Sequence, residues 1–182
     1  MVESNLAATL VRAVNALGRR PDMGLHDDAP ATARWDGDVR VATSHANGTT
    51  IQSDMPRELG GAGERITPGW LFRAGLAACA TTSIAMTAAA QGIPLTLLEI
   101  RVGSRSDTRG LLGMRDDDGQ QVYAGPQDLA LDVRIAAPGV DADRLRKLVD
   151  DGCRCSPVPN AVQHALPMPI RVDVVTETEA TP

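Results

Sequence analysis

The sequence has very few aromatic residues and no excess of positive charge. Two Trp, one Tyr and one Phe are the only aromatic residues among 182. Domains that stack nucleic-acid bases need several exposed aromatic side chains, and domains that bind phosphate need clustered Lys and Arg. Here 23 Asp and Glu residues outnumber 18 Lys and Arg residues, which gives a net charge of −5. The composition therefore predicts no binding to nucleic acid.

A secretory signal and a cysteine framework are also missing. The N-terminus lacks a basic segment followed by a long apolar run, so we expect a cytoplasmic protein. Three cysteines are an odd number, which favours reactive or inert thiols over structural disulfides. The apolar run 70–90 is long enough to span a bilayer, but it is rich in Ala, Thr and Gly and contains Arg73. We therefore expect no membrane association.

One long helix, predicted from Thr67 to Gly92, organises the chain. Thr67 suits the N-cap, and Pro68 has the φ that a first helical turn requires. Gly92 suits a left-handed residue that follows the helix. Some 24 residues would make a rod of roughly 36 Å. Because the stretch is apolar or small nearly all round, we expect burial on most sides, with the Cys79 thiol in the middle.

The other elements are predicted mainly as strands that come in runs. Alternation and two Asx-Gly turns predict a three-stranded meander over residues 31–54, and residues 55–64 read as a flexible loop. Further strands are expected at 95–105, 122–124, 129–136 and 169–176, and further helices at 3–18, 141–151 and 156–165. Strands in runs rather than in alternation with helices predict the α+β class.

Two parts of the chain differ in composition. Residues 1–30 combine an amphipathic helix with a linker rich in Asp, Pro and Gly, and residues 31–182 form the predicted main domain. The first helix carries Leu6, Leu10, Val14 and Leu17 at helical spacing. We expect it to be an appendage that docks on the main domain or on a second chain.

Three motifs follow one another in a specific order. They are Trp35-Asp36-Gly37-Asp38-Val39, then Gly60-Gly61 with Thr67-Pro68 and Leu71-Phe72-x-Ala74-Gly75-Leu76-Ala77-Ala78-Cys79, then Ser156-Pro157-Val158-Pro159-Asn160-Ala161-Val162. Together, over about residues 31–177, they resemble the OsmC/Ohr family of organic hydroperoxide reductases. The resemblance implies an intertwined homodimer in which antiparallel sheets wrap around long central helices, with active sites at the subunit interface.

The resemblance also implies a chemistry. Cys79 matches the cysteine that attacks an organic hydroperoxide, a second cysteine then forms a disulfide with it, and an external dithiol reduces that disulfide. The sequence departs from this pattern twice. Ser156 stands at the place of the second cysteine, with Cys155 and Cys153 nearby, and Gly69 stands at the place of a glutamate. Cys155 is the preferred second thiol.

Cys79 needs help to be reactive, because the N-terminus of its own helix is too far away to acidify it. Among Arg40, Arg57 and Arg65, Arg40 is preferred because the family's arginine lies in that strand region. Glu64 is the acid closest in sequence to the missing glutamate. Apolar walls are expected from the side chains Leu71, Phe72, Leu76 and Met86.

No metal or other cofactor is expected. The one Cys-x-Cys pair has no second pair nearby, and the three histidines are scattered along the chain. Two functions therefore remain. One is a thiol-dependent organic hydroperoxide reductase, and the other is a degraded member of the same fold that binds an apolar small molecule.

Overall fold

The computed structural model describes residues 6–164 and 166–175, and they form an α+β fold as predicted. The helices are α1 (Leu6–Arg19), α2 (Pro68–Ala90), α3 (Thr108–Leu111), α4 (Ala142–Arg154) and α5 (Pro157–Gln163). The strands are β1 (Thr32–Trp35), β2 (Val41–Ser44), β3 (Thr50–Ser53), β4 (Leu97–Arg105) and β5 (Gln127–Ala136). Short 3-10 turns η1 (Pro21–Gly24) and η2 (Arg57–Leu59) lie in the connections.

The long helix α2 forms where the sequence predicts it. The Thr67 hydroxyl accepts a hydrogen bond from the Trp70 backbone N–H at 3.2 Å, so Thr67 caps the helix. At the other end Gly92 has a φ of +66°, and the N–H of Ile93 reaches back to the carbonyl of Ala88 at 2.9 Å. Both predicted ends of the helix are confirmed.

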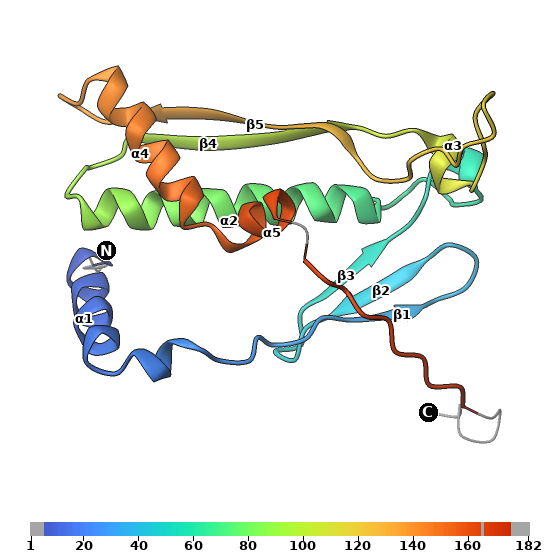
Figure 1. The fold of residues 1–182 in the computed structure, drawn as a ribbon, viewed down its shortest axis with the longest axis horizontal. Helices are drawn as coiled ribbons and strands as arrows, with labels where there is room; N and C mark the ends of the chain where they lie inside the picture. The colour runs from blue at the N-terminus through green and yellow to red at the C-terminus, as the bar shows by residue number, and fades with distance from the viewer. Residues whose placement is uncertain (1–5, 165, 176–182) are drawn as a thin grey trace.

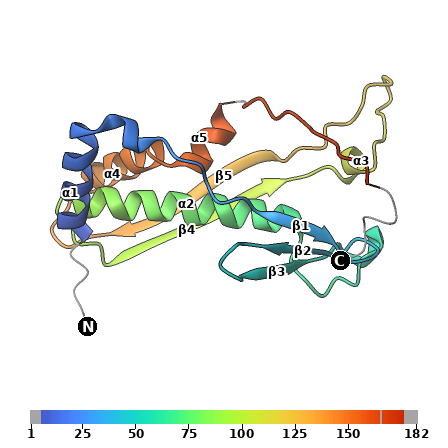
Figure 2. The ribbon, with the colours of Figure 1, turned by 90° about the horizontal axis from the view of Figure 1, so that it is seen from below.

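Two antiparallel sheets are separate in this chain. Figure 1 shows the two-stranded sheet β4–β5 running along α2, while the meander β1–β2–β3 lies apart from that sheet, near the N-terminal half of the helix. Alternate residues of β4 are shielded from solvent, including Leu98, Ile100 and Val102, as their spacing predicts. Figure 2 shows α1 and α4 near the C-terminal half of α2. The core therefore lies between α2, the two-stranded sheet and α4.

Burial of α2 differs from the prediction. In this single chain the buried residues form one stripe, whose members are Leu76, Ala80, Ser83, Ile84 and Ala88. Trp70, Phe72 and Met86 remain 48%, 38% and 40% exposed. The expectation of burial on most sides is wrong for one chain, because the strands and helices packed against α2 cover only part of its circumference.

Three further expectations are wrong. Residues 122–124 form no strand, and residues 169–175 lie outside any sheet. The end of the predicted last strand, residue 176, lies outside the described residues. A strand needs a neighbour for its backbone hydrogen bonds, and none of the described residues pairs with the 169–175 segment. The helix predicted to end at Gly152 continues to Arg154, because Gly152 is needed for close packing rather than for a left-handed turn.

The glycine-rich loop is held by a buried carboxylate rather than being loose. Asp54 is 1% exposed and accepts hydrogen bonds from the N–H groups of Met55 and Ala62, both at 2.8 Å. Burial by itself would raise the pKa of Asp54, but bonds from the backbone of Met55, Ala62 and Gly63 hold that pKa below its usual value. The loop that leads into α2 is therefore anchored.

Length and composition would allow α2 to cross a membrane, and it is the one helix among the described residues for which this is true. Core helices of water-soluble proteins meet the same criterion. Here α2 packs against α4, β4, α1 and α5. The helix thus has the contacts of a core helix along part of its surface.

Candidate active site

The Cys79 thiol lies in the middle of α2 and faces the start of α5. Its Sγ accepts a hydrogen bond from the Ser156 hydroxyl at 3.2 Å and one from the Val158 backbone N–H at 3.4 Å. Cys79 is half-buried, and Ser156 is fully buried. Hydrogen bonds donated to sulfur favour the thiolate over the thiol. Two donors from a helix start 77 residues further along the chain therefore converge on the candidate nucleophile.

The Ser156 hydroxyl bonds to Cys79 and does not cap its own helix. It occupies the N-cap position of α5, yet its side chain makes no hydrogen bond to the backbone of that helix. The turn before α5 is instead tied by the Asn160 amide, which donates to the carbonyls of Ser156 at 2.8 Å and Arg154 at 2.9 Å. This frees the hydroxyl of Ser156 to bond to Cys79.

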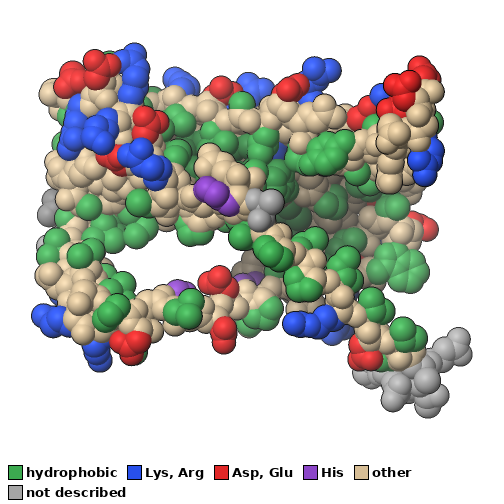
Figure 3. All heavy atoms as spheres, viewed as in Figure 1, with side chains coloured by type: hydrophobic (Ala, Val, Ile, Leu, Met, Phe, Trp, Pro, Cys, Tyr) green, Lys and Arg blue, Asp and Glu red, His purple; other side chains and the backbone are tan. Residues whose placement is uncertain are grey.

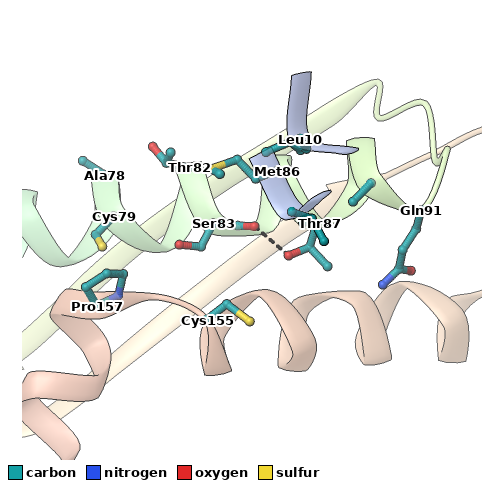
Figure 4. A pocket seen from close by; sticks show the side chains of 12 residues that line it. Leu10, Ala78, Cys79, Thr82, Ser83, Met86, Thr87, Gln91, Cys155 and Pro157 are labelled. Carbon is teal, nitrogen blue, oxygen red and sulfur yellow. Dashed lines mark hydrogen bonds between the residues drawn. The ribbon is translucent and has the colours of Figure 1, made fainter. Parts of the chain in front are cut away.

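An elongated apolar pocket of about 700 Å³ extends from Cys79 along α2 (Figure 4). Its walls come from α1, from α2 and from the α4–α5 turn. The lining residues are Leu10, Val14, Ala78, Cys79, Thr82, Ser83, Met86, Thr87, Ala90, Gln91, Cys155 and Pro157. Among these described residues none is charged. The pocket therefore suits an apolar group whose reactive end meets Cys79.

The other two cysteines have different surroundings. Cys155 is exposed and lines the pocket of Cys79. Figure 4 shows the Cys79 sulfur turned toward Pro157 and the Cys155 sulfur turned away from Cys79. Burial raises the pKa of the Cys153 thiol, and the nearby Asp150 carboxylate raises it further. Cys155 is thus the better placed second thiol, although its side chain must turn to reach Cys79.

The predicted charged partners lie elsewhere in this chain. The Arg40 guanidinium contacts its own hairpin, with Nε donating to the Asp36 carbonyl at 3.3 Å and Nη2 lying 3.7 Å from the Asp38 carboxylate. Arg57 donates to the Ala62 carbonyl at 3.0 Å, and Glu64 is exposed. Neither Arg40 nor Glu64 lines the pocket of Cys79.

The predicted apolar walls are only partly brought together. Met86 lines the pocket of Cys79, and Leu76 is buried one turn before the cysteine. Phe72 instead lines a second pocket of about 520 Å³ at the N-terminal end of α2, and Leu71 is half-buried away from both. Sequence reasoning missed the Val158 amide and the hydroxyl of Ser156 as partners of Cys79. One sequence signal could have indicated the Ser156 contact. Ser156 stands where the family pattern has its second cysteine, which must come close to Cys79.

Within residues 6–164 and 166–175, no three His, Cys, Asp or Glu side chains gather in a way that could hold a metal ion. The chemistry available to this site is therefore that of a thiol with two hydrogen-bond donors beside an apolar cavity.

Comparison with known proteins points in one direction. A family model described as OsmC-like protein matches residues 61–171. The chain is 30% identical over 132 residues to a protein of Xanthomonas axonopodis pv. citri (strain 306) named organic hydroperoxide resistance protein. That match covers 68% of this chain and 84% of the relative.

Solved structures share the fold at lower identity. A crystal structure of an OsmC-like protein from Mycoplasma pneumoniae matches with a TM-score of 0.63 and 20% identity, covering 78% of this chain and 91% of the other. A structure of an organic hydroperoxide resistance protein from Legionella pneumophila matches with a TM-score of 0.55 and 23% identity, covering 76% and 91%.

Proposed function

This chain belongs to the OsmC-like protein family, and we propose that it reduces organic hydroperoxides to alcohols with electrons from thiols. The observation that carries the proposal is the Cys79 sulfur at an apolar pocket with two hydrogen-bond donors on it. The donors favour the reactive thiolate. The apolar walls favour alkyl or aryl hydroperoxides over hydrogen peroxide, because only the former bury apolar surface on binding.

The first step is a displacement on oxygen. The Cys79 thiolate attacks the terminal oxygen of the hydroperoxide, and the O–O bond breaks. The alkoxide leaves, takes a proton from solvent and becomes the alcohol. Sulfur has lost two electrons and is now a sulfenic acid. Ser156 and the Val158 amide lie within hydrogen-bond distance of the sulfur that begins this step.

The second step returns the cysteine to its starting state. The Cys155 thiol condenses with the sulfenic acid of Cys79 to a disulfide and releases water. An external dithiol then attacks this disulfide, becomes a disulfide itself and leaves both cysteines reduced. The Cys155 side chain must first turn toward Cys79, since its sulfur points away from Cys79 in this structure. We place this chemistry in the cytoplasm, where free thiols stay reduced.

A homodimer completes the proposed site. The Arg40 side chain of one copy makes no contact with its own Cys79 and would reach the cysteine of the second copy. Apolar side chains left open in this chain support such an assembly, and Figure 3 shows many of them over the C-terminal segment and α1. An arginine there would add a fixed positive charge beside the two neutral donors.

Stoichiometric oxidation tests the function. One equivalent of cumene hydroperoxide is added to the reduced protein, the remaining thiols are alkylated, and the cysteines are mapped by mass spectrometry. We expect a Cys79–Cys155 disulfide within seconds and one equivalent of alcohol. Cys79→Ser should abolish turnover with a dithiol, and Cys155→Ser should accumulate sulfenic acid at Cys79.

Cys153→Ser is the matched control and should turn over at the wild-type rate, because its thiol takes no part. Three unreacted thiols after treatment with peroxide would exclude the peroxidase. Normal turnover of Cys155→Ser would exclude its role as second thiol while leaving Cys79 as the nucleophile.

The second candidate function is binding of an apolar molecule without turnover. It is favoured by the uncharged lining of the pocket in this chain and by the absence of an acid at Gly69. The oxidation experiment separates the two candidates, because a binding protein leaves Cys79 reduced.

A further inference from the structure

The N-terminal helix α1 forms one wall of the Cys79 pocket. Leu10 and Val14 line the cavity together with Met86 and Ala90 of α2, and Figure 4 shows Leu10 near Met86. α1 lies outside residues 61–171, which match the OsmC-like family model. This wall therefore belongs to a part of the chain that the family match does not cover.

We propose that α1 is a specificity element that selects hydroperoxides with long apolar groups, an inference that rests on the proposed function. The helix presents Leu10 and Val14 to the cavity from the same face, since they are four residues apart. The helix itself packs against α2. A substrate that fills the pocket therefore touches α1 on one side and α2 on the other.

The geometry separates long substrates from short ones. At about 1.5 Å per residue, Met86 lies roughly 10 Å and Ala90 roughly 16 Å along the helix axis from Cys79. A tert-butyl group with its peroxide at Cys79 ends well before this region. A long alkyl chain laid along α2 reaches it and buries its outer methylene groups against Leu10 and Val14.

The far end of the pocket is polar and limits the length of the apolar section. Gln91 lines that end, and its side-chain oxygen accepts a hydrogen bond from the Arg144 guanidinium at 2.8 Å. Burying the end of an alkyl group against Gln91 and Arg144 is unfavourable, because the alkyl group cannot form hydrogen bonds with these polar side chains. The cavity thus fits an alkyl group that extends from Cys79 to about Ala90.

Substitutions in α1 test the proposal with two substrates. Leu10→Gln and Val14→Gln should lower kcat/KM for dodecyl hydroperoxide about tenfold and leave kcat/KM for tert-butyl hydroperoxide unchanged. Val14 is 70% exposed, so glutamine at this position leaves folding intact. Val11→Gln is the matched control, because Val11 is on the same helix but does not line the pocket, and it should behave as wild type.

A binding measurement keeps this inference separate from the proposed function. Dodecanol, the alcohol that the long substrate would yield, should bind to the reduced wild-type protein and about tenfold more weakly to Leu10→Gln in calorimetry. Equal binding, or equal loss of activity on both hydroperoxides, would overturn the role of α1. If Cys79→Ser is inactive while both α1 variants keep full activity on dodecyl hydroperoxide, the peroxidase stands and the specificity element does not.

Discussion

Ser156 places a hydroxyl group where the family pattern has a second thiol. Its Oγ lies 3.2 Å from the Cys79 sulfur and it is fully buried. A hydroxyl can donate a hydrogen bond to a thiolate but cannot form a disulfide with it. Ser156 therefore holds the sulfur of Cys79 but cannot resolve it, and the proposed disulfide falls to Cys155.

Removing the Ser156 hydroxyl should slow the reactions of the Cys79 thiol. In a background with Cys153→Ser and Cys155→Ser, we expect Ser156→Ala to lower the rate of Cys79 alkylation by iodoacetamide at pH 7 about tenfold. A hydrogen bond to a charged group is worth about 1.5–3 kcal/mol, so losing it from the attacking sulfur corresponds to a factor of about ten or more in rate.

Ser83→Ala is the control for this measurement. It removes another hydroxyl from the same pocket, one that makes no bond to Cys79, and should leave the alkylation rate unchanged. A complementary variant, Ser156→Cys, should form a disulfide between the introduced thiol and Cys79 when peroxide is added. An unchanged alkylation rate in Ser156→Ala would show that the hydroxyl does not assist the sulfur of Cys79.

The sequence singled out the candidate nucleophile but not the groups that bond to it. Cys79 stood out because its motif resembles a family motif, which is a local signal. The bond from Ser156 joins residues 77 positions apart and depends on how α4 packs against α2. Arg40 was expected near Cys79 on the same resemblance, and one chain leaves the two apart. Local patterns carry no information about such distances.

At the scale of elements, the packing of α4 on α2 sets the position of Ser156. A Cβ atom on Gly152 would lie 2.7 Å from the Cα of Ile84, so the two helices touch backbone to backbone at this point. Both residues are buried. Because α4 leads directly into the turn that carries Ser156, this contact fixes how close the hydroxyl comes to Cys79.

Gly152→Ala should therefore destabilise the protein. An alanine inside a helix normally stabilises it by up to about 1 kcal/mol relative to glycine. Here the added methyl group overlaps Ile84, and overpacking costs typically 1–3 kcal/mol. We expect urea unfolding to show a loss of about that size, together with slower alkylation of Cys79, since α4 must shift away.

Gly18→Ala gives the matched comparison in α1, where a Cβ atom meets nothing within 4 Å. We expect it to be neutral or mildly stabilising. Equal effects of the two substitutions on the free energy of unfolding would show that the close approach at Gly152 is not tight in solution.

At the scale of the whole molecule, local sequence signals predicted where most helices and strands lie. They did not predict which strands find a partner to pair with. The cap at Thr67 and the left-handed Gly92 act within a few residues, so both ends of α2 were predictable. The strand expected at residues 169–176 has the right alternation, yet residues 169–175 join no sheet. Pairing depends on a neighbouring strand, and within this chain that neighbour is absent from the described residues.

The unpaired C-terminal segment, residues 169–175, indicates that a second chain binds here. Its apolar residues alternate with polar ones, and Ile170, Val172 and Val174 are 83%, 79% and 87% exposed. An extended segment with one open apolar face and unpaired backbone groups is suited to join the sheet of another molecule. We therefore predict a homodimer that buries this face.

Light scattering checks this prediction at micromolar concentration. The wild-type protein should have twice the 19.2 kDa mass of one chain. Val172→Asp puts a charge on the apolar face and should weaken the dimer at least tenfold, because a buried unpaired carboxylate is costly. Arg171→Asp introduces the same residue on the opposite face and should leave the dimer intact. A wild-type mass of one chain would refute the dimer, and with it the delivery of Arg40 from a second copy to Cys79.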